Sequence, residues 1–238
     1  MKRTAIVAAL FCVLAVHAQL PGLPGILDPS GLAKQESASG ATYLLNETFD
    51  STGYDVAGWT ESNTSEIKED YATAPAPLSG TQSLYFDVTA TRTADTPAFT
   101  ASDTVWISFL FHDDEATLPG GQKIICSIKD SVGGTTVASI AIESDGDMTV
   151  ACGSATQRST ASLSLNTTFR IWFSYTKGTG ANGQAAVYWD TSLAGPKGTA
   201  KASVTTGTST AQAASIRFAG YTDTEWHLDN VQVAATEF

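Results

Sequence analysis

The sequence predicts an all-β protein: a two-sheet antiparallel β-sandwich (jelly roll) preceded by a signal peptide and a flexible leader. Several segments alternate apolar and polar residues with a period of two, and no segment keeps a helical period. The composition agrees, because 33 Thr and 20 Gly in 238 residues favour strands and turns over helices. A chain with about ten to twelve strands and no helices is expected to pack them into two sheets.

Residues 1–18 have the three parts of a secretory signal peptide. A basic start precedes an apolar run over residues 4–16, and a small-x-small cleavage site ends at Ala18. The apolar run is 13 residues long. A membrane-spanning helix needs about 18 or more. We therefore expect a secreted protein, extracellular or periplasmic, without a membrane span.

The rest of the chain divides into a leader and one domain. Residues 19–42 begin with Gln-Leu-Pro-Gly-Leu-Pro-Gly, and Pro and Gly at this density hold neither a helix nor a strand ladder, so we expect a flexible leader. Residues 43–238 contain no second break of this kind and are expected to form a single jelly-roll domain. The net charge of −11 argues against nucleic acid and anionic membranes as partners, because both require a basic patch.

Two segments show the strand alternation most clearly. In residues 105–111 and 169–175 every second side chain is apolar or aromatic, which indicates strands with one face on a core. Turn signals rich in Gly and Asp, such as residues 132–134 and 145–147, separate the remaining segments. Further strands are expected at 43–49, 83–89, 123–128, 136–142, 147–152, 184–190, 214–221 and 226–234.

Cys126 and Cys152 remain after signal cleavage, in a compartment where a disulfide persists. If the two hairpins between them are tight, each cysteine lies opposite Ser139, on either side of one strand. Two strand spacings are roughly 9 to 10 Å, which is beyond the reach of a disulfide. We therefore favour two buried thiols, with a disulfide as the alternative.

Four short patterns occur in an order that resembles a known superfamily. They are Asn-Glu-Thr-Phe-Asp at 46–50, Gly-Trp at 58–59, the segment 76–84 and Trp-His-Leu-Asp-Asn-Val-Gln-Val at 226–233. Together with the hairpins, they resemble the concanavalin A-like lectin/glucanase jelly-roll superfamily, which includes laminin G-like domains and many carbohydrate-binding modules. The resemblance covers roughly residues 43–236. It implies the fold and not the function, because the fold hosts hydrolases, lyases, adhesins and structural proteins.

The resemblance also implies a structural Ca²⁺ between the first and last strands. Carboxylates in matching positions are Glu47, Asp50 and Asp229. Calcium takes six to eight oxygen ligands, of which these residues would supply three. Strand parity favours the site, because Val231 and Val233 facing the core would place Asp229 on the same side. In the alternative reading, Asp229 caps a turn or accepts hydrogen bonds from the neighbouring backbone.

A sugar-binding platform is the second candidate site. Trp106 and Trp172 lie off the core parity of their strands, on the same sides as His112 and Arg170, and a further strand carries two aromatic residues. Aromatic rings on a flat sheet stack on sugar faces, and charged or amide side chains bind the hydroxyls. Alternatively, such a Trp packs beneath a loop or the leader. The predicted carbohydrate-binding residues are Trp106, Arg170, Trp172, Tyr188 and Trp189.

Catalytic residues are not expected. Glu225, His227 and Asp229 would share one face of a strand, as general acid and base chemistry requires. However, the paired-acid run of glycosidases with this fold is missing. The nearest match, at 66–70, has Lys68 in place of an acid and is expected to be a loop.

The sequence therefore predicts a secreted, non-catalytic, lectin-like domain that recognises an extracellular glycan or another cell-surface component. A structural or adhesive surface protein that uses the sandwich as a scaffold is the alternative from a different class. A divergent glycoside hydrolase or polysaccharide lyase is the third.

Overall fold

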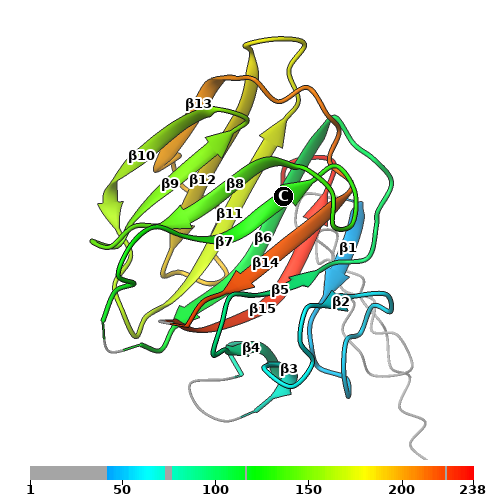
Figure 1. The fold of residues 1–238 in the computed structure, drawn as a ribbon, viewed down its shortest axis with the longest axis vertical. Coiled ribbons are helices and arrows are strands. Elements are labelled where there is room, and N and C mark those ends of the chain that lie inside the picture. Colours follow the sequence, from blue (N-terminus) through cyan, green and yellow to red (C-terminus); the bar gives the residue numbers. More distant parts are fainter. Residues whose placement is uncertain (1–41, 73–76, 116, 223) are drawn as a thin grey trace, which may run out of the picture. The chain divides into compact units, whose positions relative to one another are not determined.

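The computed structural model describes residues 42–72, 77–115, 117–222 and 224–238. Within these ranges the chain forms 15 strands and no helix, which confirms the predicted all-β class. Figure 1 shows these strands, which form two antiparallel sheets packed as a sandwich. None of the described residues belongs to a helix that could cross a membrane. The predicted signal peptide and all of the predicted leader except Thr42 lie outside the described residues.

The first sheet has eight strands in the order β13-β12-β11-β6-β15-β4-β3, with β1 also paired to β15. Both β1, from the beginning of the described chain, and β15, from its end, are therefore in this sheet (Figure 1). Its strands are β1 (Tyr43–Glu47), β3 (Ile67–Tyr71), β4 (Ser83–Asp87), β6 (Thr104–Asp113), β11 (Thr168–Thr176), β12 (Gly183–Asp190), β13 (Ala202–Gly207) and β15 (Glu225–Ala234).

The second sheet has seven strands in the order β10-β9-β8-β7-β14-β5-β2. Its hairpins β7-β8 and β8-β9 turn where the Gly-rich signals predict, and Gly146 in the second turn has a φ of 85°, which glycine adopts without strain. The strands are β2 (Thr60–Glu61), β5 (Arg92–Asp95), β7 (Lys123–Lys129), β8 (Thr136–Ile142), β9 (Asp147–Cys152), β10 (Ala155–Ser162) and β14 (Ser215–Gly220).

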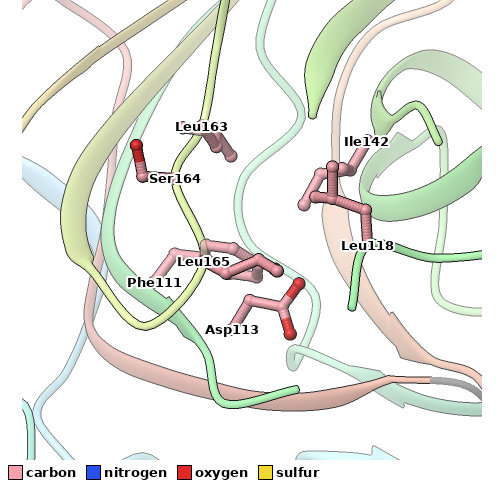
Figure 2. Close-up of a pocket in the computed structure, with 7 residues that line it drawn as sticks. All are labelled: Phe111, Asp113, Leu118, Ile142, Leu163, Ser164 and Leu165. Carbon is pink, nitrogen blue, oxygen red and sulfur yellow. The ribbon is translucent and has the colours of Figure 1, made fainter. Parts of the chain in front are cut away.

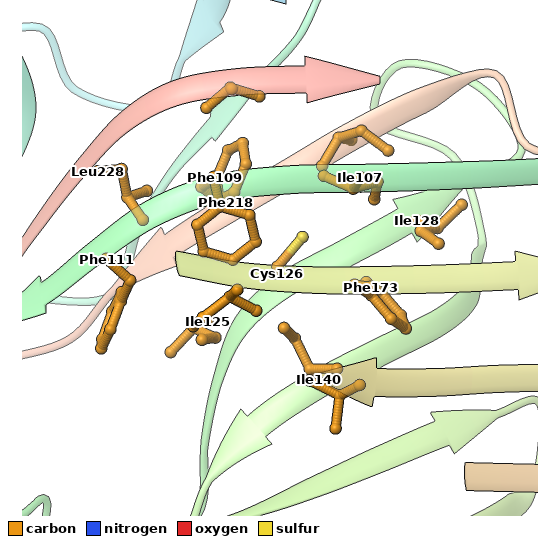
Figure 3. Close-up of a cluster of buried hydrophobic side chains, with 14 of the residues drawn as sticks. Ile107, Phe109, Phe111, Ile125, Cys126, Ile128, Ile140, Phe173, Phe218 and Leu228 are labelled. Atoms are coloured by element: carbon orange, nitrogen blue, oxygen red, sulfur yellow. The ribbon is translucent and has the colours of Figure 1, made fainter. Parts of the chain in front are cut away.

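The core lies between the two sheets. Figure 3 shows side chains from both, among them Phe109 and Phe173 of the first sheet and Ile140 and Phe218 of the second. The rings of Phe109 and Phe218 meet edge to face, with centroids 5.3 Å apart. Burying each of these side chains contributes about 1.5–3 kcal/mol to stability. The alternating residues of each strand face away from the core, so each sheet also has an outer face.

The two cysteines are buried and free, which confirms the favoured reading. They lie on β7 and β9, which flank β8 in the sheet. Neither cysteine pairs with Ser139, the predicted shared partner. Each pairs instead with a residue next to Ser139 in β8. A bulge in β7 pairs Cys126 with Ile140, and Cys152 pairs with Ala138.

The strands that were not predicted lie at or beside the sheet edges. They are β2, β3, β5, β10 and β13. Residues 66–70 were expected to form a loop, but Ile67–Tyr71 is strand β3. An edge strand pairs on one side only, and these segments are rich in Thr, Ser or charged residues, so they carry little alternation.

Candidate functional site

The outer face of the first sheet carries a row of polar and aromatic side chains that crosses five strands. Antiparallel register aligns them directly, because cross-strand partners point to the same side of a sheet. The row, called the polar row below, consists of Thr168 on β11, His112 on β6, His227 on β15, Tyr85 on β4 and Lys68 on β3.

The rings at one end of the polar row are packed on one another. The centroids of His227 and Tyr85 are 4.4 Å apart and nearly parallel. Tyr71, from the end of β3, stacks on Tyr85 at 4.2 Å and lies 5.5 Å from His227. The Lys68 ammonium lies over the rings of Tyr71 and Tyr85 at 5.7 and 5.4 Å, and it is paired with Asp87 at 2.8 Å. A cation is therefore held over an aromatic cluster.

His227 is the most unusual group of this row. Its side chain is fully buried, and neither ring nitrogen has a hydrogen-bond partner among the residues that the structure describes. Burial, and to a lesser extent nearby His112, lower the pKa of His227 to about 4, so its imidazole is neutral at pH 7. By contrast, Nδ1 of His112 lies 3.1 Å from the Thr168 hydroxyl. A buried polar group without partners is costly, which marks His227 as a candidate functional residue.

Arg170 extends from β11 across the same face. Its Nε donates to the Ser108 hydroxyl at 2.8 Å, and its Nη2 donates to Oε1 of Gln232 at 3.0 Å. Its Nη1 donates to the backbone carbonyl of Leu193 at 3.2 Å. The guanidinium carbon lies 5.8 Å from the ring centre of Trp172. The planar cation is therefore held by strands β6 and β15 and by the β12-β13 connection.

The predicted aromatic platform is partly covered. Trp106 and Tyr188 are half-buried, and their centroids are 5.9 Å apart. The Lys197 ammonium lies over both rings, at 5.0 and 4.4 Å, and is paired with Glu237 at 2.7 Å. Trp172 is only 4% exposed, so it packs within the face and does not project from it.

Four of the five predicted carbohydrate-binding residues share the outer face, and one does not. Trp172 is paired with Tyr188 across β11 and β12, and Arg170 and Trp106 lie on the same side of their strands. Trp189 alternates with Tyr188 and packs in the core beside Ile171, so it is removed from the predicted set. When two aromatic residues are adjacent in a strand, the sequence alone does not show which of them faces the core.

The three predicted calcium ligands have other partners. Both carboxylate oxygens of Glu47 accept two hydrogen bonds each, from the backbone N–H groups of Phe49, Asp55 and Val56 and from the Trp59 indole. A carboxylate has about four lone-pair sites, and these four donors use them. Glu47 thus fixes the connection between β1 and β2, and a calcium ion would have to displace these donors.

Asp50 and Asp229 also bind backbone N–H groups. Asp50 accepts from Thr81 at 2.6 Å, and Asp229 accepts from Ser79 and from Asn230, each at 2.6 Å. A bulge after Asp229, where Asn230 has a φ of 49°, places Asp229 on the opposite side of β15 from the one that parity predicts. Burial raises the pKa of Asp229 to about 8. In the described parts of the chain, no group of three or more His, Cys, Asp or Glu is arranged to hold a metal ion.

No sequence pattern identified three residues of the outer face as site residues. They are Tyr85, Tyr71 and Lys68. Tyr85 lies in β4, where residues on both faces are buried, so the strand shows no alternation. Tyr71 and Lys68 lie in β3, the expected loop. Glu225, His227 and Asp229 do share the outer side of β15, as predicted, but the Asp229 carboxylate is bound to the backbone.

A small cavity lies near the ends of β6 and β8. Its volume is about 10 Å³, which is room for about one water molecule and far below an ordinary ligand pocket. Figure 2 shows the Asp113 carboxylate pointing into the space, and burial raises the pKa of this group to about 6. The cavity is therefore a packing gap, lined by Phe111, Asp113, Leu118, Ile142, Leu163, Ser164 and Leu165.

Solved structures with the same fold include two polysaccharide lyases and a toxin binding domain. An endo-β-1,4-glucuronan lyase from the fungus Trichoderma reesei is 14% identical, with a TM-score of 0.55 over 82% of this chain and 96% of that one. A PL-14 alginate lyase from Aplysia kurodai is 10% identical, with a TM-score of 0.57 over 82% of this chain and 100% of that one.

A third neighbour is the binding domain of botulinum neurotoxin DC, in complex with SialylT. It is 11% identical, with a TM-score of 0.53 over 82% of this chain and 48% of that one. At these identities the likeness shows the β-sandwich fold alone. No family model and no curated protein matches the chain.

Proposed function

We propose that the chain is a secreted, lectin-like protein of the concanavalin A-like jelly-roll class that binds an extracellular glycan on the outer face of its first sheet. The observation that carries this proposal is the polar row, in which imidazole, phenol, ammonium and hydroxyl groups from five strands align on one face. Such groups donate hydrogen bonds to sugar hydroxyls, and stacked rings cover sugar faces. The structural neighbours support it, since two of them are lyases of glucuronan and alginate and a third is a toxin binding domain.

The proposal is tested by binding of the full mature chain to an array of extracellular polysaccharides. Tyr71 is half-buried at the edge of the face, so Tyr71→Ala removes an accessible ring without opening the core. We expect this variant to bind the recognised glycan about 10-fold more weakly, the size of one stacking contact. Arg158→Gln, on an exposed strand of the second sheet, is the matched control and should bind normally.

Absence of binding to every polysaccharide would contradict the proposal and favour the structural or adhesive scaffold. Equal loss in Tyr71→Ala and Arg158→Gln would also contradict it, because the two residues belong to different sheets.

We keep a structural Ca²⁺ at Glu47, Asp50 and Asp229 as a separate part of the proposal. Repeating the binding and thermal unfolding measurements with EDTA tests it. If an ion holds these carboxylates, the melting temperature falls on chelation and returns on adding Ca²⁺. An unchanged melting temperature assigns the three carboxylates to the backbone hydrogen bonds that they already make.

A second candidate function is cleavage of a uronic-acid polysaccharide by β-elimination. His227 is fully buried beside the Tyr71 ring, so this reaction requires Tyr71 to move aside. The imidazole, neutral and without partners among the described residues, then takes the proton next to the uronate carboxylate. The freed electron pair forms a carbon–carbon double bond, the glycosidic C–O bond breaks, and the leaving oxygen takes a proton from Tyr85. Burial and the charges of Glu225 and Asp87 raise the pKa of Tyr85, which keeps its proton available.

The double bond, conjugated with the carboxylate, gives an ultraviolet absorbance that grows as the polymer is cleaved. Cleavage by the native chain that is lost in both His227→Gln and Tyr85→Phe would establish this second function. If no unsaturated product forms from a polymer that the chain binds, the protein is a lectin and not a lyase.

A further inference from the structure

Arg170 is a half-buried cation with no carboxylate partner in the described part of the chain. The described residues contain several Arg–carboxylate pairs, such as Arg217 with Asp95, but no ion pair includes Arg170. Asp190 lies directly across on β12, yet its carboxylate accepts from the Ser192 N–H instead. Burial lowers the pKa of Arg170, which agrees with a charge that has lost water without gaining an anion. Charges removed from water are normally paired, so this one is an exception.

Arg170 and Gln232 together have unused hydrogen-bond donors. The bonds of Arg170 to Ser108, Leu193 and Gln232 use three of its five N–H groups, so two remain. Because a guanidinium only donates, Oε1 of Gln232 must face it, and the amide nitrogen of Gln232 therefore points elsewhere. No described residue accepts a hydrogen bond from that nitrogen. Gln232 is 7% exposed, and Arg170 is half-exposed beside it.

We propose that Arg170 and Gln232 form an anion subsite on the outer face, which binds the carboxylate or sulfate group of an acidic glycan. The proposal rests on the glycan-binding function above and names the class of glycan. The subsite offers only donors, and a carboxylate or sulfate offers only acceptors. A neutral hydroxyl would leave the cation uncompensated.

The geometry also fixes the orientation of the Arg170 guanidinium. The Ser108 hydroxyl and the Leu193 carbonyl hold the guanidinium plane, and the Trp172 ring lies 5.8 Å from its carbon. A planar, fixed fork binds a two-oxygen anion through paired hydrogen bonds. The chain as a whole carries a net charge of −11, so it does not attract anionic polymers in general. Recognition of an acidic glycan therefore depends on this local site.

The test compares matched polymers on the native chain. Polygalacturonate and alginate carry carboxylates, and the same polymers after carboxyl reduction are neutral. Dextran sulfate and dextran form a second matched pair, which separates sulfate from carboxylate. We expect binding to at least one anionic member and roughly 10- to 100-fold weaker binding to its neutral partner, the value of a charge-assisted hydrogen-bond pair.

Substitutions of Arg170 test whether this side chain causes the preference for the anionic polymer. Arg170→Gln removes the charge and should weaken binding to the anionic polymer by a similar factor. Arg170→Lys keeps the charge without the fork and should restore part of the binding. Arg217→Gln, which breaks an ion pair on the second sheet, is the control and should leave binding unchanged. Thermal unfolding of each variant verifies that it is folded.

The outcomes separate this inference from the proposed function. Binding to the neutral polymers as tightly as to the anionic ones overturns the anion subsite and leaves the glycan-binding proposal intact. No binding to any polymer overturns both. If Arg170→Gln does not fold, the comparison of native chain on charged and reduced polymers still decides the question.

Discussion

The two outer faces of the sandwich have the same backbone geometry and different chemistry. The outward residues of β7, β8 and β9 in the second sheet are small or hydroxylated, such as Ser127, Ser139 and Thr149. Of its charged outward residues, Arg217 is paired with Asp95, and Lys129 donates to the Gly134 carbonyl and the Thr136 hydroxyl. The outer face of the first sheet instead carries aromatic rings, two histidines and the Arg170 guanidinium, which no carboxylate of the described residues pairs.

The difference between the two faces shows which outward side chains the fold requires and which it does not. A solvent-facing sheet needs only short polar side chains and satisfied charges, and the second sheet has these. The polar row also contains His227, a fully buried imidazole without a hydrogen-bond partner among the described residues, which lowers stability. This cost fits the glycan-binding role that we propose for the first sheet.

The largest expected effect is on stability, from Trp172→Ala. Its ring is 4% exposed although it lies on an outer face, so truncation should lower the free energy of unfolding by about 3 kcal/mol or more. Thr149→Ala, at a half-buried outward position of β9, should change it by less than about 0.5 kcal/mol. Urea denaturation measures both. Similar values for the two variants would remove the distinction between the faces.

The second effect is a pH dependence confined to the first sheet. The pKa of His227 is lowered from 6.5 to about 4, so between these values the unfolded chain binds more protons than the folded one. Its contribution to stability is therefore complete above pH 6.5 and is lost as the pH falls towards 4. At 1.36 kcal/mol per pK unit the loss is about 3 kcal/mol.

His227→Gln isolates this contribution. The difference in unfolding free energy between native chain and variant should change by about that amount between pH 7 and pH 4. Other groups cancel in the difference, including Asp229, whose raised pKa makes stability fall as the pH rises from about 4 to 8. His112, Tyr85, Tyr71 and Lys68 face His227 and remain in both proteins. A difference that does not vary with pH would mean that His227 is hydrated.

A smaller effect is expected from Lys197→Ala. This change removes the ammonium from the rings of Trp106 and Tyr188 and breaks the pair with Glu237. The free energy of unfolding should fall by about 0.5–1 kcal/mol. Glu237→Gln keeps the cation over the rings and should cost less. If Glu237→Gln costs as much as Lys197→Ala, the ring contacts contribute nothing.

The smallest effect is expected on the second sheet. Arg158 is paired with Asp145 and Asp147 at an exposed hairpin, and exposed pairs contribute little. Arg158→Gln should leave the midpoint of urea denaturation nearly unchanged. A clear fall of the midpoint would show that the second sheet also depends on a charged surface network.

Sequence patterns predicted the strands that bury one face. They failed where strand pairing or a local bulge determines the structure. The central strands β6, β8, β9 and β11 alternate clearly and were placed within a residue or two. The edge strands β10 and β13 lack apolar alternation and were missed. Asp229 was assigned to the wrong side because one bulge reverses strand parity, and a bulge has no reliable sequence signal.

The candidate site was predictable only in part, for the same reason. The shared face of Arg170, Trp172 and Trp106 follows from parity within two neighbouring strands. The meeting of His112 with His227 and of His227 with Tyr85 depends on which strands pair, and those strands are distant in the chain. Hydrophobic periodicity does not determine strand order, so this part of the site needed the structure.

The position of β15 has a consequence for the timing of folding. This last strand of the chain pairs with β6, β4 and β1 in the interior of the first sheet. During synthesis the earlier strands emerge first, but they cannot close the sheet across the gap that Glu225–Ala234 fills. The first sheet therefore closes only after Glu225–Ala234 has emerged from the ribosome. Losing the final strand would leave two exposed strand edges in the middle of the molecule, where aggregation begins.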